Sequence, residues 1–323
     1  MLAEIRRAVD FDAYAWLLTD PETWVGSAPL ADVPCLPELP RLIRLKYLTP
    51  VNRWTGLPPR GVATLLAATA GDLSRSRLWR ELLHAFQVVD VVSVVFRDRY
   101  GCWGFLDLWR IGGSASAFTA AESGFLAGIV PAVTTALRSA EAATFTASPG
   151  GDPPGPVVLL LSADLRLLAQ TPETDAYLRA LVPPEPGAAP VPAGAYNVAA
   201  QLLAVEEGID RNPPVARVHL PAGRRLTLRA ARIADARAAT QDTIAVTIEP
   251  ASSPERLQLF ARSSALTKRE TELLRHLATG TDTRELAHRL SLSEHTVQDH
   301  LKSIFGKTRT RSRRDLLARA LGL

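Results

Sequence analysis

Two stretches rich in proline, glycine and serine divide the chain. The first, TASPGGDPPGP, spans residues 146–156, and the second, EPASSPER, spans residues 249–256. Proline fixes a backbone dihedral and removes a hydrogen-bond donor, and glycine weakens helices and strands, so neither stretch is expected inside a helix or a sheet. We therefore predict three domains, over residues 1–147, 156–250 and 263–323, with a connector helix over residues 251–262.

The first segment holds all six tryptophans of the chain, and its second half has a clear pattern. LWRELLHAF has helical spacing, VVDVVSVVFR and CWGFLDLWR are strand-like and separated by the turn DRYG, and FTAAESGFLAGIVPAVTTALRSA predicts a long helix with a kink at Pro131. Residues 1–77 are expected to supply a helix, one or two strands and the helical stretch LPELPRLIRLKYL. This order resembles GAF-type sensory domains.

The middle segment begins with a predicted hairpin, VVLLLS and LRLLAQ, joined by a turn at Ala163-Asp164. Two helical stretches follow, PETDAYLRAL and YNVAAQLLAVEEG, with the loop VPPEPGAAPVPAG between them. Three predicted strands end the segment: ARVHL, RLTLRAARI and DTIAVTIEP. Two strands, helices and three strands resemble the order of a PAS domain. No repeat of fixed period is present, so a solenoid is not expected.

Positive charge is concentrated in the last segment. Residues 263–323 contain 12 Lys or Arg and 7 Asp or Glu, a net charge of +5, whereas the whole chain has +4 and the first 262 residues therefore −1. A small basic terminal module is the electrostatic footprint of a protein that binds phosphate backbones.

Boundary signals predict four helices in this module. Thr267 and Glu270 form a capping box at the start of KRETELLRHLAT, and Gly280 ends that helix. A short helix, TRELAHRL, comes next. Ser293 is the expected N-cap of the third helix, and the last helix, SRRDLLARALG, begins at Ser312.

The third helix is predicted to be amphipathic. At 100° per residue, its apolar face is formed by Val297, Leu301, Ile304 and Phe305, and its opposite face by His295, Gln298, Asp299 and Lys302. A short helix, a tight turn and a second helix with a free polar face are the elements of a helix-turn-helix, which inserts the second helix into the major groove of DNA.

Residues 266–321 resemble the LuxR/FixJ-type helix-turn-helix almost from end to end. The resemblance is carried by Leu266-Thr267, Arg269-Glu270, Leu274, Gly280, Glu285-Leu286-Ala287, Leu290, Ser293, Thr296-Val297, His300, Ile304, Lys307 and Ser312-Arg313. Thr308-Arg309-Thr310 departs from the Leu-Gly-Val that is more usual, which predicts a different corner between the last two helices.

This resemblance implies roles for individual residues. Gln298, Asp299 and Lys302, with His295 on the same face, are expected to face bases. Phosphate contacts are assigned to Arg284, Ser293, Thr296, Lys307, Arg309, Ser312 and Arg313. The last helix is expected to form a dimer contact through Leu316, Leu317, Ala320 and Leu321.

Asp299 has two interpretations. Its carboxylate can accept a hydrogen bond from cytosine N4, while Lys302 donates to guanine and Gln298 pairs with adenine. Alternatively, it forms an intrahelical pair with Lys302 or His295.

An aromatic ligand pocket is the candidate sensing site of the first segment. Trp103, Phe105, Asp107 and Trp109 alternate along one predicted strand and share a face, and Trp79 lies on the preceding helix. Asp107 would be the polar group of such a pocket. Core packing is the competing explanation of these aromatics.

Other kinds of site find less support. Gly306-Lys307-Thr308 lacks the upstream glycine of a phosphate-binding loop, and His288, His295 and His300 have no cysteine beside them, so no metal site is predicted. Cys102 is either a redox sensor or, as is usual for a free cysteine, a buried apolar residue. No cofactor is identified.

Other classes of protein fit the sequence less well. A receiver domain needs acidic residues at parallel strand ends that are missing here, and Asp20-Pro21 with Trp24 is only a fragment of the acyl-homoserine lactone pattern. No catalytic constellation supports an enzyme, and a purely architectural DNA-binding protein leaves the first 250 residues without a role. No signal peptide or membrane span is predicted from the short apolar runs.

The expected fold is therefore multi-domain α+β: a GAF-like α/β domain, a PAS-like α/β domain and an all-α helix-turn-helix domain. We expect a cytoplasmic, dimeric, one-component transcriptional regulator. Its expected partners are double-stranded DNA, a second copy of the chain and a small-molecule effector of unidentified chemistry, with no membrane.

Overall fold

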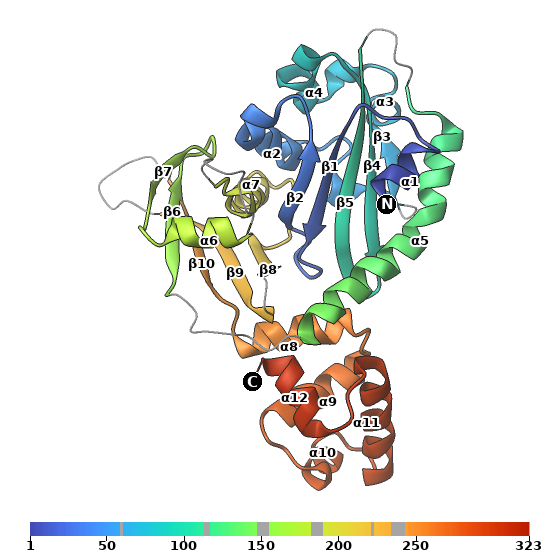
Figure 1. The fold of residues 1–323 in the computed structure, drawn as a ribbon, viewed down its shortest axis with the longest axis vertical. Coiled ribbons are helices and arrows are strands. Elements are labelled where there is room, and N and C mark those ends of the chain that lie inside the picture. Colours follow the sequence, from blue (N-terminus) through green and yellow to red (C-terminus); the bar gives the residue numbers. More distant parts are fainter. Residues whose placement is uncertain are drawn as a thin grey trace. The chain divides into compact units, whose positions relative to one another are not determined.

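A computed structural model describes residues 1–58, 61–112, 117–146, 155–181, 190–220, 223–233 and 243–322 (Figure 1). Most of the first predicted linker and much of the predicted loop at residues 182–194 lie outside the described residues. The chain divides into two compact units. The N-terminal unit comprises residues 1–135, 155–218 and 227–249, and the C-terminal unit comprises residues 136–154, 219–226 and 250–323.

A five-stranded antiparallel sheet forms the first part of the N-terminal unit. Its strands are β1 (Ala13–Thr19), β2 (Gly26–Asp32), β3 (Val62–Thr64), β4 (Val88–Asp98) and β5 (Gly101–Ile111), in the order β2-β1-β5-β4-β3. The predicted hairpin is β4 and β5. Its turn is stabilised by Asp98, whose carboxylate accepts hydrogen bonds from the backbone N–H groups of Tyr100 and Gly101.

Helix α1 (Leu2–Arg6) precedes the first strand. Three other short helices pack against this sheet: α2 (Leu39–Leu48), α3 (Leu65–Ala68) and α4 (Arg77–Glu81). Leucines of α2, α3 and α4 meet β4 and β5 in one buried apolar cluster, which includes Leu45, Leu65, Leu78, Val91 and Trp109. The predicted helix before the hairpin is thus present as α4, although it is shorter than the sequence pattern indicated.

The middle segment forms a second five-stranded sheet. Its strands are β6 (Val157–Leu161), β7 (Leu167–Gln170), β8 (Val215–His219), β9 (Arg225–Arg232) and β10 (Ile244–Pro250), in the order β7-β6-β10-β9-β8. Helices α6 (Thr174–Leu181) and α7 (Ala193–Glu206) connect β7 to β8. The predicted succession of two strands, helices and three strands is confirmed. Both sheets have the same strand order, which the sequence did not reveal because no residue pattern repeats.

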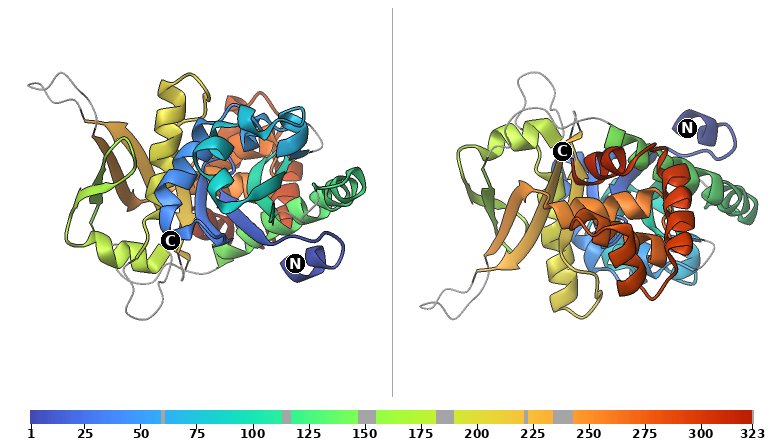
Figure 2. Two further views of the ribbon diagram at one scale, coloured as in Figure 1. Left: turned by 90° about the horizontal axis from the view of Figure 1, so that it is seen from above. Right: turned by 90° about the horizontal axis from the view of Figure 1, so that it is seen from below.

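Helix α7 lies between the two sheets in both views (Figures 1 and 2). It is buried on every side, as expected for a helix of mostly small and apolar residues. Gly194 shows how close the contact is: a Cβ there would meet Leu228 of β9 at 3.0 Å and the backbone oxygen of Ser27 of β2 at 3.4 Å.

Buried ion pairs also join the first and middle segments. The Arg217 guanidinium donates to both carboxylate oxygens of Asp20, at 2.6 and 2.7 Å, and these side chains are 5% and 0% exposed. Arg53 pairs with Asp210 at 2.5 Å. The two segments predicted as separate domains therefore lie in one compact unit.

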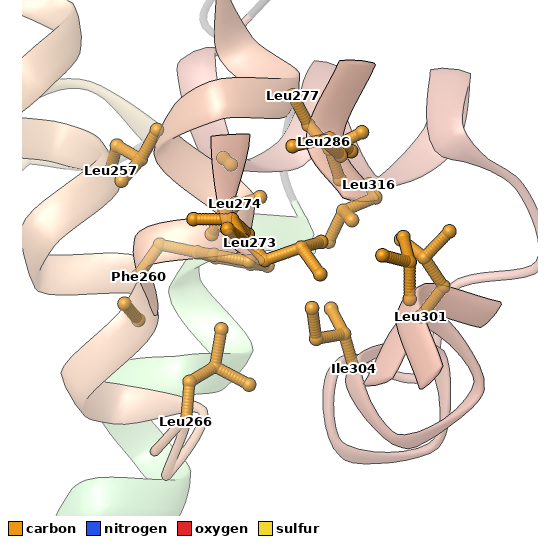
Figure 3. Packing of buried hydrophobic residues seen from close by; sticks show 14 of the residues in the cluster. Leu257, Phe260, Leu266, Leu273, Leu274, Leu277, Leu286, Leu301, Ile304 and Leu316 are labelled. Carbon is orange, nitrogen blue, oxygen red and sulfur yellow. The ribbon is translucent and has the colours of Figure 1, made fainter. Parts of the chain in front are cut away.

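Five helices account for most of the C-terminal unit: α8 (Ser253–Ser263), α9 (Lys268–Ala278), α10 (Thr283–Arg289), α11 (Glu294–Thr308) and α12 (Arg313–Leu321). The connector helix and the four helices predicted after it are confirmed. They share one apolar core, to which α8 contributes Leu257 and Phe260, and α9 contributes Leu273, Leu274 and Leu277 (Figure 3).

Residues far from the helical module in sequence complete this unit. Phe145 is 1% exposed, and its ring lies 5.2 Å from that of Phe260 of α8. The guanidinium of Arg225 lies 3.7 Å from the centroid of Phe145 and pairs with Glu141. The core of the C-terminal unit is thus larger than the predicted domain at 263–323.

Helix α5 (Ala120–Ala143) is the longest of the described helices, with Pro131 inside it as predicted. The helical stretch 120–146 contains an 18-residue window of mean hydropathy 1.3, of which 11% is buried, so its length and composition would allow it to cross a membrane. The expectation of no membrane span was based on uninterrupted apolar runs, and α5 meets the criterion of a span by length and composition only. Its longest stretch without a polar residue, GFLAGIVPAV at residues 124–133, contains Pro131 and is shorter than the roughly 18 residues of a membrane span.

Candidate functional site

The N-terminus of α11 is fixed by local hydrogen bonds. Ser293 is its N-cap, as predicted, and the Ser293 hydroxyl accepts from the backbone N–H of Thr296 at 3.0 Å. The same hydroxyl lies 2.8 Å from that of Thr296. These bonds satisfy helix-terminal groups and set the direction in which the chain enters the helix.

Helix α11 has the two faces predicted for it. Val297, Leu301 and Ile304 are buried in the core of the C-terminal unit, with exposures of 0–2%. On the opposite face, the side chains of His295, Asp299 and Lys302 are 85%, 56% and 76% exposed, and Gln298 is exposed as well. All four residues predicted to face bases therefore lie on one solvent-exposed face.

The carboxylate of Asp299 lies between the imidazole of His295 and the ammonium group of Lys302 on this face. Asp299 Oδ2 is 3.5 Å from Nε2 of His295, and Oδ1 is 3.6 Å from Nζ of Lys302. Both intrahelical pairs considered from the sequence are present. Exposed pairs of this kind contribute little to stability, at most about 1 kcal/mol, so both partners can rearrange when a ligand approaches.

The residues assigned to phosphates occupy different positions. Arg284, Arg309 and Ser312 are exposed, and Ser312 is the N-cap of α12. Arg313 donates to the hydroxyl of Thr283 at the start of α10. Ser293 and Thr296 lie at the N-terminus of α11, where backbone N–H groups and the helix dipole favour an anion.

Lys307 is engaged within the protein. Its ammonium group donates to both carboxylate oxygens of Glu270, at 2.8 and 2.6 Å, and the Ser303 hydroxyl donates to the same carboxylate at 2.6 Å. Glu270 also completes the predicted capping box with Thr267. Burial alone would raise the pKa of Glu270, but the hydrogen bonds from Lys307, Ser303 and Thr267 hold it at about 2. This cluster fastens α11 to α9.

The corner between α11 and α12 is formed without a glycine. Arg309, which stands where glycine is more usual, adopts a left-handed conformation with φ of 52°, and its backbone N–H donates to the carbonyl of Phe305. The hydroxyls of Thr308 and Thr310 lie 2.9 Å apart on either side of it. The departure from the usual Leu-Gly-Val thus places an exposed cation at a position that favours glycine.

The four residues predicted to form a dimer contact on the last helix have different surroundings. Leu316 and Ala320 are fully buried in the apolar core of the C-terminal unit, so their side chains form no surface. The reason is that α12 packs on α8 and α9 with this face. Leu317 and Leu321 are partly buried against the same core and are the members of the predicted set that reach solvent.

The aromatic residues predicted as a ligand pocket are only partly brought together. Asp107 and Trp109 line a cavity of the N-terminal unit. Phe105 stacks on Trp54 with ring centroids 4.7 Å apart. The indole N–H of Trp103 donates to Asp98, and that of Trp79 donates to the carbonyl of Val88. Trp79, Trp103 and Phe105 are not among the residues that line this cavity.

The partners of Asp107 were not predicted from the sequence. Lys46 on α2 pairs with Asp107 at 2.9 Å, and Trp54 and Ser93 donate to the other carboxylate oxygen at 2.8 and 2.6 Å. One signal could have identified Lys46. It is the lone lysine among the first 262 residues, where the other permanent cations are arginines, yet it lies in a largely apolar helical stretch.

Cysteine and metal chemistry have little basis among the residues that the structure describes. Cys102 and Cys35 are buried, and burial raises the pKa of their thiols to about 12 and about 11. A thiol with such a pKa is a poor nucleophile, which favours the apolar role of Cys102. Within the described ranges, no group of three or more His, Cys, Asp or Glu side chains could hold a metal ion.

Comparisons with known proteins concern mainly the C-terminal unit. Residues 264–320 match the model of bacterial regulatory proteins of the luxR family. A probable HTH-type transcriptional regulator, GfsR of Streptomyces halstedii, is 43% identical over 60 residues, which cover 19% of this chain and 25% of that protein. Because the match spans a quarter of this relative, it concerns the helical module and leaves the other residues undescribed.

Solved structures give a weaker likeness. SdiA of Escherichia coli is 15% identical with a TM-score of 0.32, and the alignment covers 100% of this chain and 90% of that chain. VqmA of Vibrio cholerae is 18% identical with a TM-score of 0.20 and shares 52% of this chain and 82% of that chain. The family assignment therefore depends on the sequence match and on the geometry of α10 and α11: residues 264–320 form a helix-turn-helix domain of the luxR family of bacterial regulatory proteins.

Proposed function

We propose that this protein is a one-component transcriptional regulator that binds double-stranded DNA through α11. The observation that carries the proposal is the exposed polar face of α11, held by a capped N-terminus and by the Glu270 cluster, within a matched helix-turn-helix domain. The net charge of +5 over residues 263–323 supplies affinity for the phosphate backbone. The matched family is described as bacterial regulatory proteins, which supports a regulatory role for this chain.

Sequence readout follows from the chemistry of this face. Lys302 can donate to guanine O6 or N7, Gln298 can form two hydrogen bonds with adenine, and Asp299 can accept from cytosine N4. Arg284, Ser293, Thr296, Arg309, Ser312 and Arg313 are proposed to contact phosphates. Lys307 contributes by positioning α11 through Glu270, because its ammonium group is already bound to a carboxylate.

The first 250 residues are proposed to sense a small molecule in the cytoplasm and to act on DNA binding in a dimer. The GAF-like and PAS-like resemblances support this role, as do the two five-stranded sheets of identical strand order. SdiA has been solved in complex with octanoyl-rac-glycerol, and VqmA has been described as a dimer. For the present chain, we propose both ligand binding and dimerisation.

The readout by Lys302 is tested with full-length protein and a DNA duplex selected from a randomised pool by the unmodified chain. Lys302→Ala is expected to weaken binding to the selected duplex by roughly 10- to 100-fold, because a good base contact contributes about 1–3 kcal/mol of discrimination. Lys268→Ala removes the same charge from an exposed position at the start of α9 and serves as the control. Gel shifts at fixed salt in which the two variants lose affinity equally would contradict a groove-facing Lys302.

The role of the Asp299 carboxylate is tested with a second variant. Asp299→Ala is expected to tighten binding to random duplexes, since it removes a negative charge near phosphates, and to reduce the preference for the selected duplex. Both affinities are measured by fluorescence anisotropy at two salt concentrations. A uniform loss of affinity for all DNA would show that Asp299 has a different role.

A further inference from the structure

Helix α5 has one buried side and one exposed side. On the buried side, Leu126 and Thr134 are 0% and 3% exposed. The 11 exposed residues between positions 121 and 143 recur every three to four positions, which places them on one side of the helix. We call this surface the α5 face. It includes Gly124, Phe125, Gly128, Ala132, Ala136 and Ser139.

No charged residue lies on the α5 face. The charged residues of α5 are Glu122, Arg138 and Glu141, and all three are half-buried. Phe125 is 40% exposed and is the one aromatic ring among the exposed large apolar side chains of the described residues. A helix that packs on its own protein ordinarily turns charged and polar residues to solvent. An uncharged exposed face with an aromatic at one end is instead typical of an interaction surface.

Two glycines of the α5 face have no role within the described chain. A Cβ at Gly124 or Gly128 would meet no other part of it within 4 Å, and neither residue has the positive φ that favours glycine. Glycine inside a helix is destabilising relative to alanine. Gly124, Gly128 and Ala132 follow one another at intervals of four, a spacing of small residues that lets a second helix approach closely. Contact with a second helix would explain these glycines.

The chemistry of the α5 face fits a second copy of the chain. A two-fold interface brings one patch against itself, so a charge on that patch would lie close to its own copy, and the α5 face has none. The face extends about 33 Å at 1.5 Å per residue, and half the surface of a helix about 10 Å wide over this length is roughly 500 Å². Two copies would bury about 1,000 Å², which is the lower bound of a specific interface.

A lipid surface is the competing occupant, because α5 is long and apolar enough to cross a membrane. Helices that lie on membranes combine Lys and Arg on one face with large apolar residues on the other. Helix α5 has a single cation, Arg138, and Phe125 is the one large side chain of its exposed face. Small residues offer little apolar area to insert into lipid, whereas they allow two helices to pack closely. The observations therefore favour a second copy.

We propose that two copies of the chain associate through the α5 face, with Ala132 next to the two-fold axis. Ala132 lies at the middle of the face, so a symmetric contact centred there places the two Ala132 side chains opposite each other. The inference rests on the dimer of the proposed function and names its surface. It places the main contact on α5, since Leu316 and Ala320 of the contact expected on α12 are buried.

Opposite charges at Ala132 test this arrangement in the full-length protein. Ala132→Glu and Ala132→Lys are expected to fold, because the position is exposed and both new residues are good helix formers. The unmodified protein is expected to dimerise with a Kd of about 1–10 μM, as suits a small interface. Each variant alone should dimerise at least about 100-fold more weakly, because like charges meet at the axis. An equimolar mixture of the two should dimerise within about 10-fold of the unmodified protein, because Glu then meets Lys.

Sedimentation velocity without DNA gives the measurement, at protein concentrations of about 1–100 μM and about 50 mM salt, where screening is moderate. Ala176→Glu makes the same change at an exposed position of α6 and should dimerise like the unmodified protein. Circular dichroism at 222 nm confirms that each variant is folded.

Three results would overturn the proposal: an unmodified protein that is monomeric at about 100 μM, variants at Ala132 that dimerise as well as it does, or a mixture that stays monomeric. Co-sedimentation with vesicles of phosphatidylcholine and phosphatidylglycerol that is lost in Ala132→Glu would assign the α5 face to lipid and would also overturn it. Sedimentation reports on α5 and the gel shifts of Lys302→Ala report on α11, so the dimer surface and the DNA readout can fail separately.

Discussion

Asp20→Ala is expected to destabilise the N-terminal unit by up to about 3–5 kcal/mol, because it leaves the buried Arg217 guanidinium with the partly exposed Glu22 as its remaining counter-charge. The carboxylate of Asp20 is 0% exposed and accepts two bonds from the guanidinium and one from the backbone N–H of Arg217. Burial alone would lower the pKa of Arg217, but the hydrogen bonds and charges of Asp20 and Glu22 raise it in the folded protein.

Chemical denaturation followed by tryptophan fluorescence measures this effect. Glu38→Ala is the matched control, since it removes the partner of Arg41 in an exposed pair and should cost less than about 1 kcal/mol. The double variant Asp20→Ala with Arg217→Met, which removes both charges, is expected to recover much of the loss. If Asp20→Ala costs no more than Glu38→Ala, the ion pair does not hold the two segments together.

The second large effect concerns the pH dependence of the C-terminal unit. Glu270 has a pKa of about 2 in the folded protein against an ordinary value of 4.5, so it stabilises the fold when ionised. This contribution is fully present above pH 4.5 and is lost as the pH falls through 4.5 toward 2. A shift of this size corresponds to roughly 3 kcal/mol at about 1.36 kcal/mol per pH unit.

Glu270→Gln keeps the shape of the side chain and removes its charge. We expect this variant to be less stable than the wild type at pH 7 by up to roughly 3 kcal/mol, and to lose less stability between pH 5 and pH 2. Glu272→Gln, on the same helix in an exposed pair with Arg269, is the control. Circular dichroism at 222 nm during urea unfolding gives the measurement, and identical pH profiles of wild type and Glu270→Gln would refute the role of this cluster.

The helices of the C-terminal unit could be predicted well because their signals are local. Ser293 and Ser312 cap helices within a few residues of themselves, and Thr267 forms its capping box with Glu270 three positions away. The apolar spacing of α11 also identified its buried face. The sequence could not show that Glu270 also pairs with Lys307, because 37 positions separate the two residues.

In the N-terminal unit, the strands could be predicted from the sequence, but the residues that line the cavity could not. Alternation identified β4 and β5, and the order of elements in the middle segment was correct. The cavity escaped prediction because Lys46, Trp54, Asp107 and Asn197 come from four elements that only the folded sheet brings together. The linker at residues 146–156 suggested that the first and middle segments are separate domains. In the structure, α7 is buried and Arg217 pairs with Asp20 of the first segment, so the two segments pack together.

The central claim is that the exposed face of α11 enters a groove of DNA, and directed cleavage tests it most directly. Cys35 and Cys102 are buried, so a thiol introduced by Gln298→Cys can be labelled selectively with an iron–EDTA reagent. On the selected duplex, the labelled protein is expected to cut both strands at one short site per bound α11, whereas label at Lys268→Cys on α9 should cut weakly or elsewhere. Cleavage that is equal from both positions, or absent from position 298 although the protein is bound, would contradict the claim.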